Sequence, residues 1–287
     1  MLKEILKTIR INHYIKNLIV FVPLVFSMNI NKPEACLQAL IMFVSFCLIS
    51  SVIYILNDLT DIKSDRQHPI KCSRPLASGK IKPLTAVWLL IFFLCIGMFL
   101  AGSLNTLCVL AVVSYIALNI LYTLKLKHLA LIDVLCIAIG FILRILSGCF
   151  AISVIPSPLV ILLTFFLSMF FTFSKRTLEA GMLDSVNCRP SIKDFDVNLL
   201  KQFIIISAVL TITFYFNYML DPLTIERTGS KFLYITTIPF TILMFRLIYL
   251  IFTSKNIDDP VHFIYKDNIV KSFIIIYLIV LFITLKF

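Results

Sequence analysis

Apolar runs long enough to cross a lipid bilayer are the feature that most constrains this chain. A helix of about 20 mostly apolar residues spans the hydrocarbon core and satisfies its own backbone polar groups. Nine runs approach that length, at residues 17–31, 36–56, 83–103, 105–124, 130–154, 157–174, 202–220, 232–253 and 269–286. The sequence therefore predicts an all-α, polytopic membrane protein with nine transmembrane helices, in a single domain over residues 1–287.

The composition supports this class and excludes an ordinary soluble protein. Hydrophobic residues make up 60% of the chain, charged residues only 14%, and the mean hydropathy is +1.00. A net charge of +11 also suits nucleic-acid binding, but the charges lie between the apolar runs and not along one stripe. We therefore expect no nucleic-acid partner.

The eight cysteines form no C-x-x-C pair, and they indicate neither disulfides nor a metal centre.

The distribution of Lys and Arg predicts the orientation in the membrane. Cytoplasmic loops carry an excess of these residues. With a cytoplasmic N-terminus, the opposite side receives only Lys32, Arg227, Lys231 and Lys286. Residues 1–16 are expected to form an interfacial amphipathic helix, because apolar and basic residues fall on different sides of it. Nine spans then place the C-terminus on the other side of a cytoplasmic membrane.

The segment 57–82 carries a dense set of charges between two apolar runs. At about 100° per helical residue, Asp58, Asp61 and Asp65 fall within an arc of roughly 60° on one helix face. Mg²⁺ takes a few hard oxygen ligands from a protein and completes its shell with substrate phosphates and water. We therefore predict that the three aspartates hold Mg²⁺ bound to a diphosphate.

A basic loop follows the aspartates. Pro69 ends the helix, and Lys71 and Arg74 come next as cations that would hold the phosphate oxygens the metal leaves free. The alternative is a juxtamembrane helix whose charges pair with one another as a solvated face. Because Asp58 and Asp61 begin at the end of an apolar run, we favour the metal site.

The fifth run contains two charges, Asp133 and Arg144, on one helical stripe. Eleven residues separate them, or roughly 16 Å along a helix, so they cannot pair with each other. Charges inside a span usually face a cavity or a partner. Alternatively, Asp133 lies near the surface beside Lys127 and Arg144 pairs with another helix.

The sixth run ends with three further charged residues, Lys175, Arg176 and Glu179. They are candidate site residues, but a positive-inside anchor with an ion pair also explains them.

These motifs are similar to those of a known family. NDLTDIKSD followed by HPIKCSRPLASG resembles the first aspartate-rich motif of the UbiA-type intramembrane prenyltransferase superfamily, and its extended form resembles the decaprenyl-phosphate phosphoribosyltransferase branch. The segment 122–148 is similar to the second motif of that branch, and SKRTLE resembles its G-K-R-x-x-E. Arg10, Lys16 and Asn17 stand where the branch carries R-P-x-x-W-x-K-N, although Ile11 and Tyr14 replace its proline and tryptophan.

The resemblance implies a nine-helix bundle with a cytoplasm-facing cavity and active-site segments at 57–82 and 122–148. It implies a pentosyltransferase that uses Mg²⁺ to transfer a 5-phosphoribosyl group from phosphoribosyl diphosphate to a polyprenyl phosphate, for cell-envelope polysaccharide or glycolipid synthesis. The implied catalytic residues are Asn57, Asp58, Asp61 and Asp65. The implied substrate-binding residues are Lys16, Asn17, His68, Lys71, Arg74, Lys127, Asp133, Arg144, Lys175, Arg176 and Glu179. A homo-oligomer is compatible with the sequence.

Two other functions are open to a chain of this kind. Transfer of a prenyl group from a prenyl diphosphate to an aromatic or other acceptor is disfavoured, because prenyl-diphosphate users in the superfamily commonly carry a second D-x-x-x-D pair and Ile137 stands four residues after Asp133. A transporter or lipid flippase would use Asp133 and Arg144 as coupling or substrate sites. It does not explain why the carboxylates and the basic loop occur together, and no inverted repeat is seen.

Overall fold

The computed structural model describes residues 2–67, 71–181, 196–254 and 259–286. All regular structure in these ranges is helical, and eight of the helices are long and apolar enough to cross a membrane. The chain is an integral membrane protein. Its contacts divide it into two compact units, residues 1–124 with 143–155 and residues 125–142 with 156–287, each with its own apolar core.

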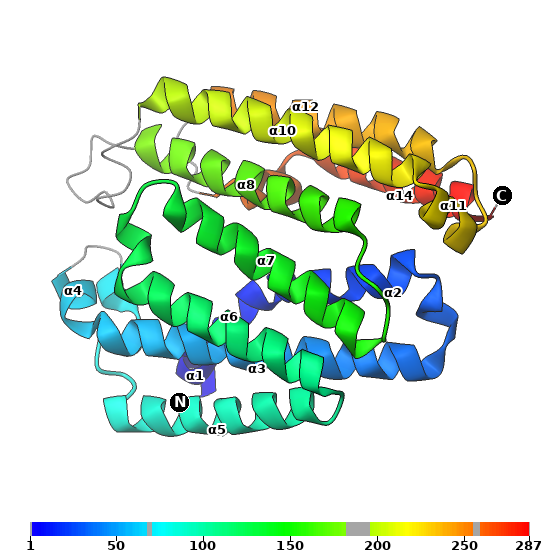
Figure 1. Ribbon diagram of the computed structural model, residues 1–287. Helices are drawn as coiled ribbons and strands as arrows, with labels where there is room; N and C mark the ends of the chain where they lie inside the picture. Colours follow the sequence, from blue (N-terminus) through cyan, green and yellow to red (C-terminus); the bar gives the residue numbers. More distant parts are fainter. Residues whose placement is uncertain (1, 68–70, 182–195, 255–258, 287) are drawn as a thin grey trace. The chain divides into compact units, whose positions relative to one another are not determined.

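Helix α3 (Pro33–Thr60) is the centre of the first unit. Helices α5 (Pro83–Gly102) and α6 (Thr106–Leu124) and the 3₁₀ helix η1 (Ile11–Phe21) all pack against it (Figure 1). Because α3 has neighbours on several sides, 61% of its apolar span is buried, against 17% of the span in α5. α3 is therefore apolar around most of its circumference, while α5 has a face available to lipid.

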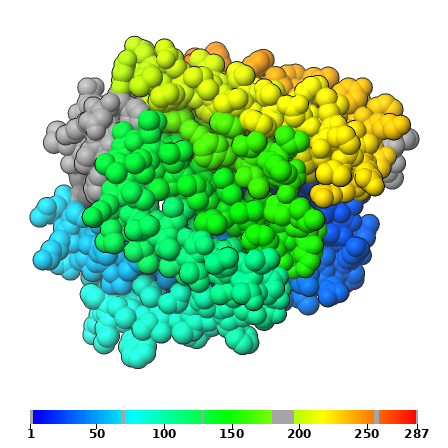
Figure 2. Space-filling view, viewed as in Figure 1, coloured from blue at the N-terminus to red at the C-terminus, as the bar shows by residue number. Residues whose placement is uncertain are grey.

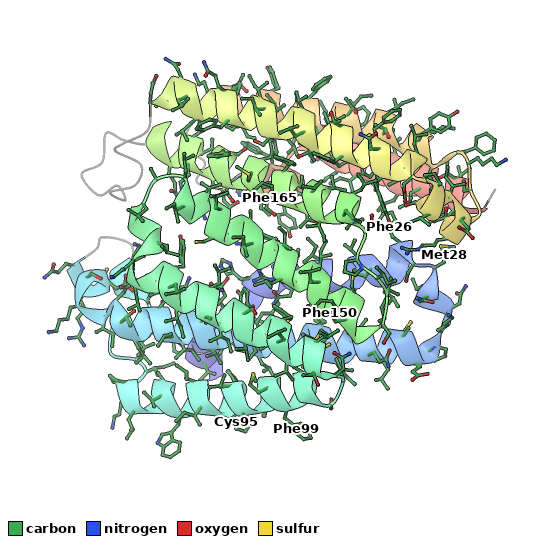
Figure 3. The ribbon with its side chains drawn as sticks, in the orientation of Figure 1. Phe26, Met28, Cys95, Phe99, Phe150 and Phe165 are labelled. Atoms are coloured by element: carbon green, nitrogen blue, oxygen red, sulfur yellow. The ribbon has the colours of Figure 1, made fainter. Side chains whose placement is uncertain are left out.

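The outer face of α5 carries exposed apolar side chains that suit contact with lipid. Phe99 is 74% exposed, and it projects from α5 near Cys95 (Figure 3). The α5 atoms, cyan in Figure 2, lie uncovered on the side shown there. Exposed apolar side chains on this scale are unfavourable in water and suit a hydrocarbon environment. On the inner face, Ser45 of α3 donates a hydrogen bond to the Gly97 carbonyl at 2.8 Å.

The N-terminal part of the chain departs from the predicted first span. Helix α1 (Leu2–Thr8) is shorter than the predicted amphipathic helix, and the run at 17–31 falls on η1, α2 (Val22–Phe26) and η2 (Asn29–Asn31). Left-handed backbone at Arg10 (φ 53°) and Met28 (φ 57°) bounds this stretch at both ends. Its apolar helical part, Ile11–Phe26, is shorter than any of the eight spans. The described residues thus contain eight spans and this shorter element, so the predicted count of nine is not confirmed.

Three more elements complete the first unit: α4 (Ile62–Gln67), η3 (Lys71–Ser73) and the second half of α7 (Ile132–Ala151). Asn105, in the turn before α6, donates to the Phe150 carbonyl at 2.8 Å and ties α7 to that turn. A smaller apolar cluster lies around Ile9, Ile55, Leu76, Ile81 and Ala86. This cluster anchors the loop after η3 to α3 and α5.

Gly148 permits close contact between α7 and η1. A Cβ at this position would clash with the Val20 carbonyl oxygen. We expect Gly148→Ala to be about 1–3 kcal/mol less stable than Gly102→Ala, because backbone must move to relieve the contact. At Gly102 a Cβ would meet only Val109 Cγ2, at 3.9 Å. Thermal unfolding in detergent compares the two, and equal melting temperatures would contradict the expectation.

The second unit contains the remaining helices. They are η4 (Leu126–His128), the first half of α7, α8 (Pro158–Gly181), α10 (Val197–Leu220), α11 (Pro222–Thr228), η5 (Leu233–Thr236), α12 (Thr237–Thr253), α13 (Val261–Lys266) and α14 (Asn268–Lys286). Helices α8 and α10 form the most extensive helix pair, with the Phe166 and Phe214 rings stacked between them. The Tyr215 hydroxyl bonds to Thr236 at 2.7 Å and to Tyr277 at 3.0 Å, which joins α10, η5 and α14.

Candidate functional site

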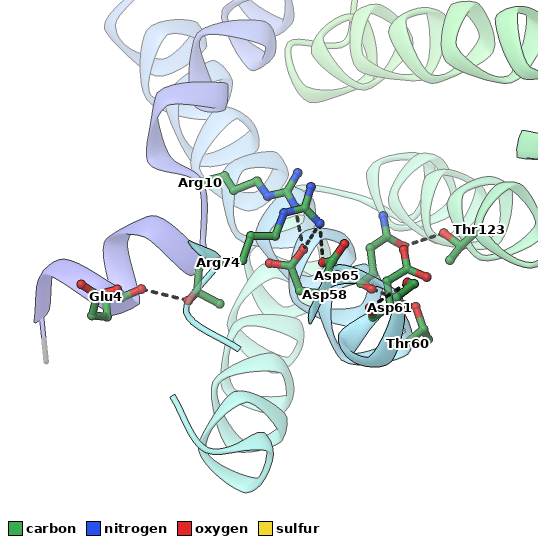
Figure 4. Close-up of polar contacts among 11 residues, drawn as sticks. Glu4, Arg10, Asp58, Thr60, Asp61, Asp65, Arg74 and Thr123 are labelled. Atoms are coloured by element: carbon green, nitrogen blue, oxygen red, sulfur yellow. Dashed lines mark hydrogen bonds and ion pairs between the residues drawn. The ribbon is translucent and has the colours of Figure 1, made fainter. Parts of the chain in front are cut away.

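A cluster of two buried aspartates and two partly exposed arginines lies in the first unit. Asp58 Oδ1 accepts hydrogen bonds from Arg10 Nη2 at 2.6 Å and from Arg74 Nη1 at 3.3 Å (Figure 4). The same Arg74 nitrogen donates to Asp65 Oδ2 at 2.7 Å. The Asp58 and Asp65 side chains are 2% and 6% exposed, whereas Arg10 and Arg74 are 24% and 30% exposed. The carboxylates are therefore the inner part of the cluster and the guanidinium groups the outer part.

The local chain path brings the two aspartates together. Helix α3 ends at Thr60, with Asp61 as its C-cap, and α4 starts at Ile62. The Asp65 amide still donates to the Asp61 carbonyl at 2.8 Å, so the helical direction nearly continues across the break. Asp58 and Asp65 share a side and meet on Arg74, as the helical spacing predicted, while the Asp61 side chain is half-buried. Within the described ranges, no group of three or more His, Cys, Asp or Glu side chains is arranged to hold a metal ion.

Asn57 is held next to this cluster by α6. Thr123 donates its hydroxyl to Asn57 Oδ1 at 2.6 Å, and the same hydroxyl lies 2.8 Å from the Asn119 carbonyl. Asn57 precedes Asp58 on the last turn of α3. The contact fixes the end of α3, and with it Asp58, against α6.

A second polar cluster lies deeper in the first unit, around Arg144. This side chain donates from Nε to Asn17 Oδ1 at 2.7 Å and from Nη2 to the Tyr115 hydroxyl at 2.8 Å. Its guanidinium carbon lies 4.7 Å from the centre of the Tyr115 ring and 5.9 Å from that of Phe46. Asn17 is 1% exposed, Arg144 is 7% exposed, and Asn17 also donates to Ser50 at 3.3 Å. These contacts orient the guanidinium within the first unit.

The second unit contains a buried ion pair between α7 and α8. Arg176 donates from Nε to Asp133 Oδ2 at 3.0 Å, and its Nη2 lies 2.8 Å from the same oxygen as an ion pair. Its Nη1 donates to Glu179 Oε2 at 2.8 Å. Asp133 and Arg176 are 1% and 3% exposed, and Asp133 Oδ1 is buried without a hydrogen-bond partner among the described residues. Asp133 and Arg144 thus have separate sets of partners, as their separation along α7 predicted.

The remaining predicted residues lie nearer the surface. Lys16 in η1, Lys71 in η3 and Lys127 in η4 are all half-buried. Lys175 is 3.5 Å from Asp259, and both side chains are about 40% exposed. His68 lies outside the described residues.

Several residues that contact the predicted site were not among the predicted site residues, and three of them are Arg10, Thr123 and Tyr115. Arg10 lies 48 residues from its partner Asp58, and Thr123 lies 66 residues from Asn57. Tyr115 bonds to Arg144 across 29 residues. The N-terminal motif that contains Arg10 was a usable signal, because it also supplied Lys16 and Asn17. Thr123 and Tyr115 are ordinary residues of an apolar helix and carried no such signal.

Comparison with known proteins gives a consistent result. A sequence model of the UbiA prenyltransferase family matches residues 18–266. Decaprenyl-phosphate phosphoribosyltransferase of Mycolicibacterium smegmatis is 26% identical over 280 residues, covering 93% of this chain and 87% of the relative. The protein of the same name from Corynebacterium glutamicum is 28% identical over 249 residues, covering 84% of this chain and 74% of the relative.

The fold is also similar to that of a solved structure. A UbiA homolog from Archaeoglobus fulgidus bound to DMAPP and Mg²⁺ superposes with a TM-score of 0.74 at 18% identity. The match covers 97% of this chain and 99% of that one. At this level of identity the comparison establishes the fold.

Proposed function

The chain belongs to the UbiA prenyltransferase family, and on that premise we propose that it transfers a 5-phosphoribosyl group from phosphoribosyl diphosphate to a polyprenyl phosphate. Relatives named decaprenyl-phosphate phosphoribosyltransferase, which align over most of the chain, support this choice of donor and acceptor. The product would serve the synthesis of cell-envelope polysaccharide or glycolipid. The N-terminus and the reacting residues face the cytoplasm in this proposal, and the C-terminus lies on the opposite side.

The observation that carries the proposal is the buried cluster in which Arg74 bridges Asp58 and Asp65. Mg²⁺ in diphosphate-using enzymes is held by one or two carboxylates, and substrate phosphates and water complete its coordination. Two inward carboxylates with cations beside them fit that pattern, and they fit it without a third protein ligand. We propose that Asp58 and Asp65, with Asp61 beside them, hold Mg²⁺. When bound, the ion neutralises the charge that develops on the leaving diphosphate.

The basic residues of the first unit act on the same leaving group. Arg74 and Lys71 donate hydrogen bonds to diphosphate oxygens whose negative charge increases as the bond to the ribose C1 breaks. Asn57, held by Thr123, positions the end of α3 that carries Asp58. Because the acceptor phosphate is already ionised at neutral pH, the reaction needs no protein nucleophile.

The second unit contains a buried acceptor with an unfilled position. Asp133 Oδ1 has no hydrogen-bond partner among the described residues, which costs about 1–3 kcal/mol if nothing satisfies it. We propose that this oxygen accepts a hydrogen bond from a hydroxyl group of a ligand. Arg176 is engaged by Asp133 and Glu179 and so orients that carboxylate. Lys175 is more exposed and is the proposed contact for a substrate phosphate.

Labelled substrates test the function directly. Membranes that contain the protein are incubated with labelled phosphoribosyl diphosphate, Mg²⁺ and polyprenyl phosphates of several lengths. We expect label in a solvent-extractable lipid whose mass equals the polyprenyl phosphate plus one phosphoribosyl group. Membranes with Asp61→Asn serve as the matched control and should form little product.

Two results would contradict the proposal. One is the absence of lipid-bound label with every polyprenyl phosphate. The other is transfer only from a labelled prenyl diphosphate to an aromatic acceptor in the same membranes, which would establish prenyl transfer in its place.

A further inference from the structure

Arg10 occupies a position that phosphoribosyl transfer by itself does not require. It comes from the N-terminal segment, 48 residues before Asp58, and it makes the shortest contact in the aspartate–arginine cluster, at 2.6 Å. Its backbone is left-handed, with φ 53° and ψ 52°, at the junction of α1 and η1. A non-glycine residue in this conformation is uncommon. The chain therefore turns at Arg10 in the conformation that delivers its side chain to Asp58.

The cluster is electrically balanced without a metal ion. Asp58 and Asp65 carry two negative charges, and Arg10 and Arg74 carry two positive charges, so the four side chains have no net formal charge. A divalent cation that approaches Asp58 or Asp65 therefore meets two guanidinium groups already bound there. Like charges in a partly buried site repel strongly, because the surroundings screen them less than bulk water does. The carboxylates can accept a metal only if the guanidinium groups find other anions.

A diphosphate supplies those anions. Arginine binds phosphate oxygens through paired N–H donors as well as it binds carboxylates. The Arg10 and Arg74 side chains are partly exposed, whereas Asp58 and Asp65 are buried on helices, so the arginines are the groups free to move. The Arg10 guanidinium also lies over the Tyr54 ring, 4.8 Å from its centre, and this contact can hold the group nearby after it leaves Asp58.

We propose that Arg10 is a positioning residue that neutralises Asp58 in the metal-free protein and exchanges that carboxylate for a substrate phosphate, so that divalent metal and diphosphate bind cooperatively. The inference rests on the metal site of the proposed function but not on the identity of the transferred group. Coupling of this kind is reciprocal: diphosphate tightens metal binding by the same factor by which metal tightens diphosphate binding. Couplings between sites are commonly about 5–150-fold, and here we expect at least about tenfold.

Equilibrium binding of Mn²⁺ to the full chain in lipid nanodiscs tests the proposal. Mn²⁺ is titrated alone and with saturating inorganic diphosphate, and free concentrations are corrected for the complex in solution. Asp58→Asn provides the baseline for binding at other carboxylates. In the wild-type protein, diphosphate should lower the Kd for Mn²⁺ at least about tenfold. An unchanged Kd would overturn the proposal without any variant.

Variants of Arg10 then separate its charge from its shape. Arg10→Gln should bind Mn²⁺ alone about tenfold more tightly than wild type and lose most of the coupling, because Asp58 loses the nearer of its two cations and keeps only the longer contact with Arg74. Arg10→Lys keeps the positive charge and should leave binding of Mn²⁺ alone weak. Lys63→Gln removes an exposed charge on nearby α4 and should change the Kd less than about threefold. Equal or weaker binding of Mn²⁺ alone by Arg10→Gln would contradict the inference.

These results are independent of the transfer assay. Coupled binding of Mn²⁺ and diphosphate without a labelled lipid product would reject the proposed donor and acceptor while supporting the role of Arg10. Formation of the labelled lipid product without coupled binding would support the proposed donor and acceptor and reject the role of Arg10.

Discussion

Asp58→Asn is expected to reduce transfer by about 10³-fold or more in an enzyme that remains folded. Asparagine has a similar shape, but it has no charge and only one acceptor oxygen. It would bind a divalent metal poorly and would leave Arg10 and Arg74 with a weaker partner. Both arginines are partly exposed, so water can solvate them and the free energy of unfolding should change little. The measurements are the rate of labelled product formation over a range of Mg²⁺ concentrations and the melting temperature.

Glu34→Gln is the matched control for this variant. Glu34 lies in the first turn of the same helix, α3, at the opposite end from Asp58, and it is exposed. The substitution makes the same chemical change without touching the cluster, so activity should stay within about twofold. If Asp58→Asn kept more than a tenth of wild-type activity at saturating Mg²⁺, Asp58 would not be a metal ligand.

Arg176→Gln is expected to destabilise the protein by about 3–5 kcal/mol. The substitution leaves the buried Asp133 carboxylate without its charge partner, and the Asp133 side chain is only 1% exposed. An uncompensated charge inside a membrane protein is costly because neither water nor lipid can solvate it there. Thermal unfolding in detergent or nanodiscs measures the effect. The double variant Asp133→Asn with Arg176→Gln should recover part of the loss, since the only charge that then lacks its Arg176 contact is Glu179, which is 23% exposed and can be solvated.

Arg246→Gln gives the comparison with a partly exposed pair. Arg246 donates to Asp267 at 2.7 Å, and the two side chains are 25% and 15% exposed. The hydrogen bond from Arg246 lowers the pKa of the Asp267 carboxyl below its ordinary value. Solvent nevertheless screens such a pair, so its loss should cost about 0–1 kcal/mol. If Arg246→Gln and Arg176→Gln lowered the free energy of unfolding by similar amounts, burial would not set the strength of the Asp133–Arg176 pair.

Most of the membrane helices could be predicted because their signal is local. The predicted runs at 83–103 and 105–124 correspond to α5 (Pro83–Gly102) and α6 (Thr106–Leu124) within two residues at each end. A span is recognised from the apolarity of its own residues, so no knowledge of its neighbours is needed. The first predicted span is not confirmed, because apolarity does not report backbone breaks. The left-handed residues Arg10 and Met28 bound this stretch, and its apolar helical part, Ile11–Phe26, is shorter than the eight spans.

Part of the candidate site was also predictable, because its signal is local in the sequence. Helical spacing puts Asp58 and Asp65 on one side across a short stretch of chain, and the structure brings both to Arg74. The partners of the more distant charges were not predictable. Arg176 lies 43 residues from Asp133, and Arg144 lies 127 residues from Asn17.

The sequence by itself determined the membrane class, most of the spans, and the types of residue that can hold a metal and a diphosphate. These properties follow from hydropathy and from the 3.6-residue period of a helix, both of which act over a few turns. Only the tertiary structure decided that Arg10 contacts Asp58 and that Asp133 has one oxygen engaged and one without a partner among the described residues. Hydrogen bonds and ion pairs depend on distances below about 3.5 Å. Those distances are set by how helices far apart in the sequence pack, and no local pattern contains them.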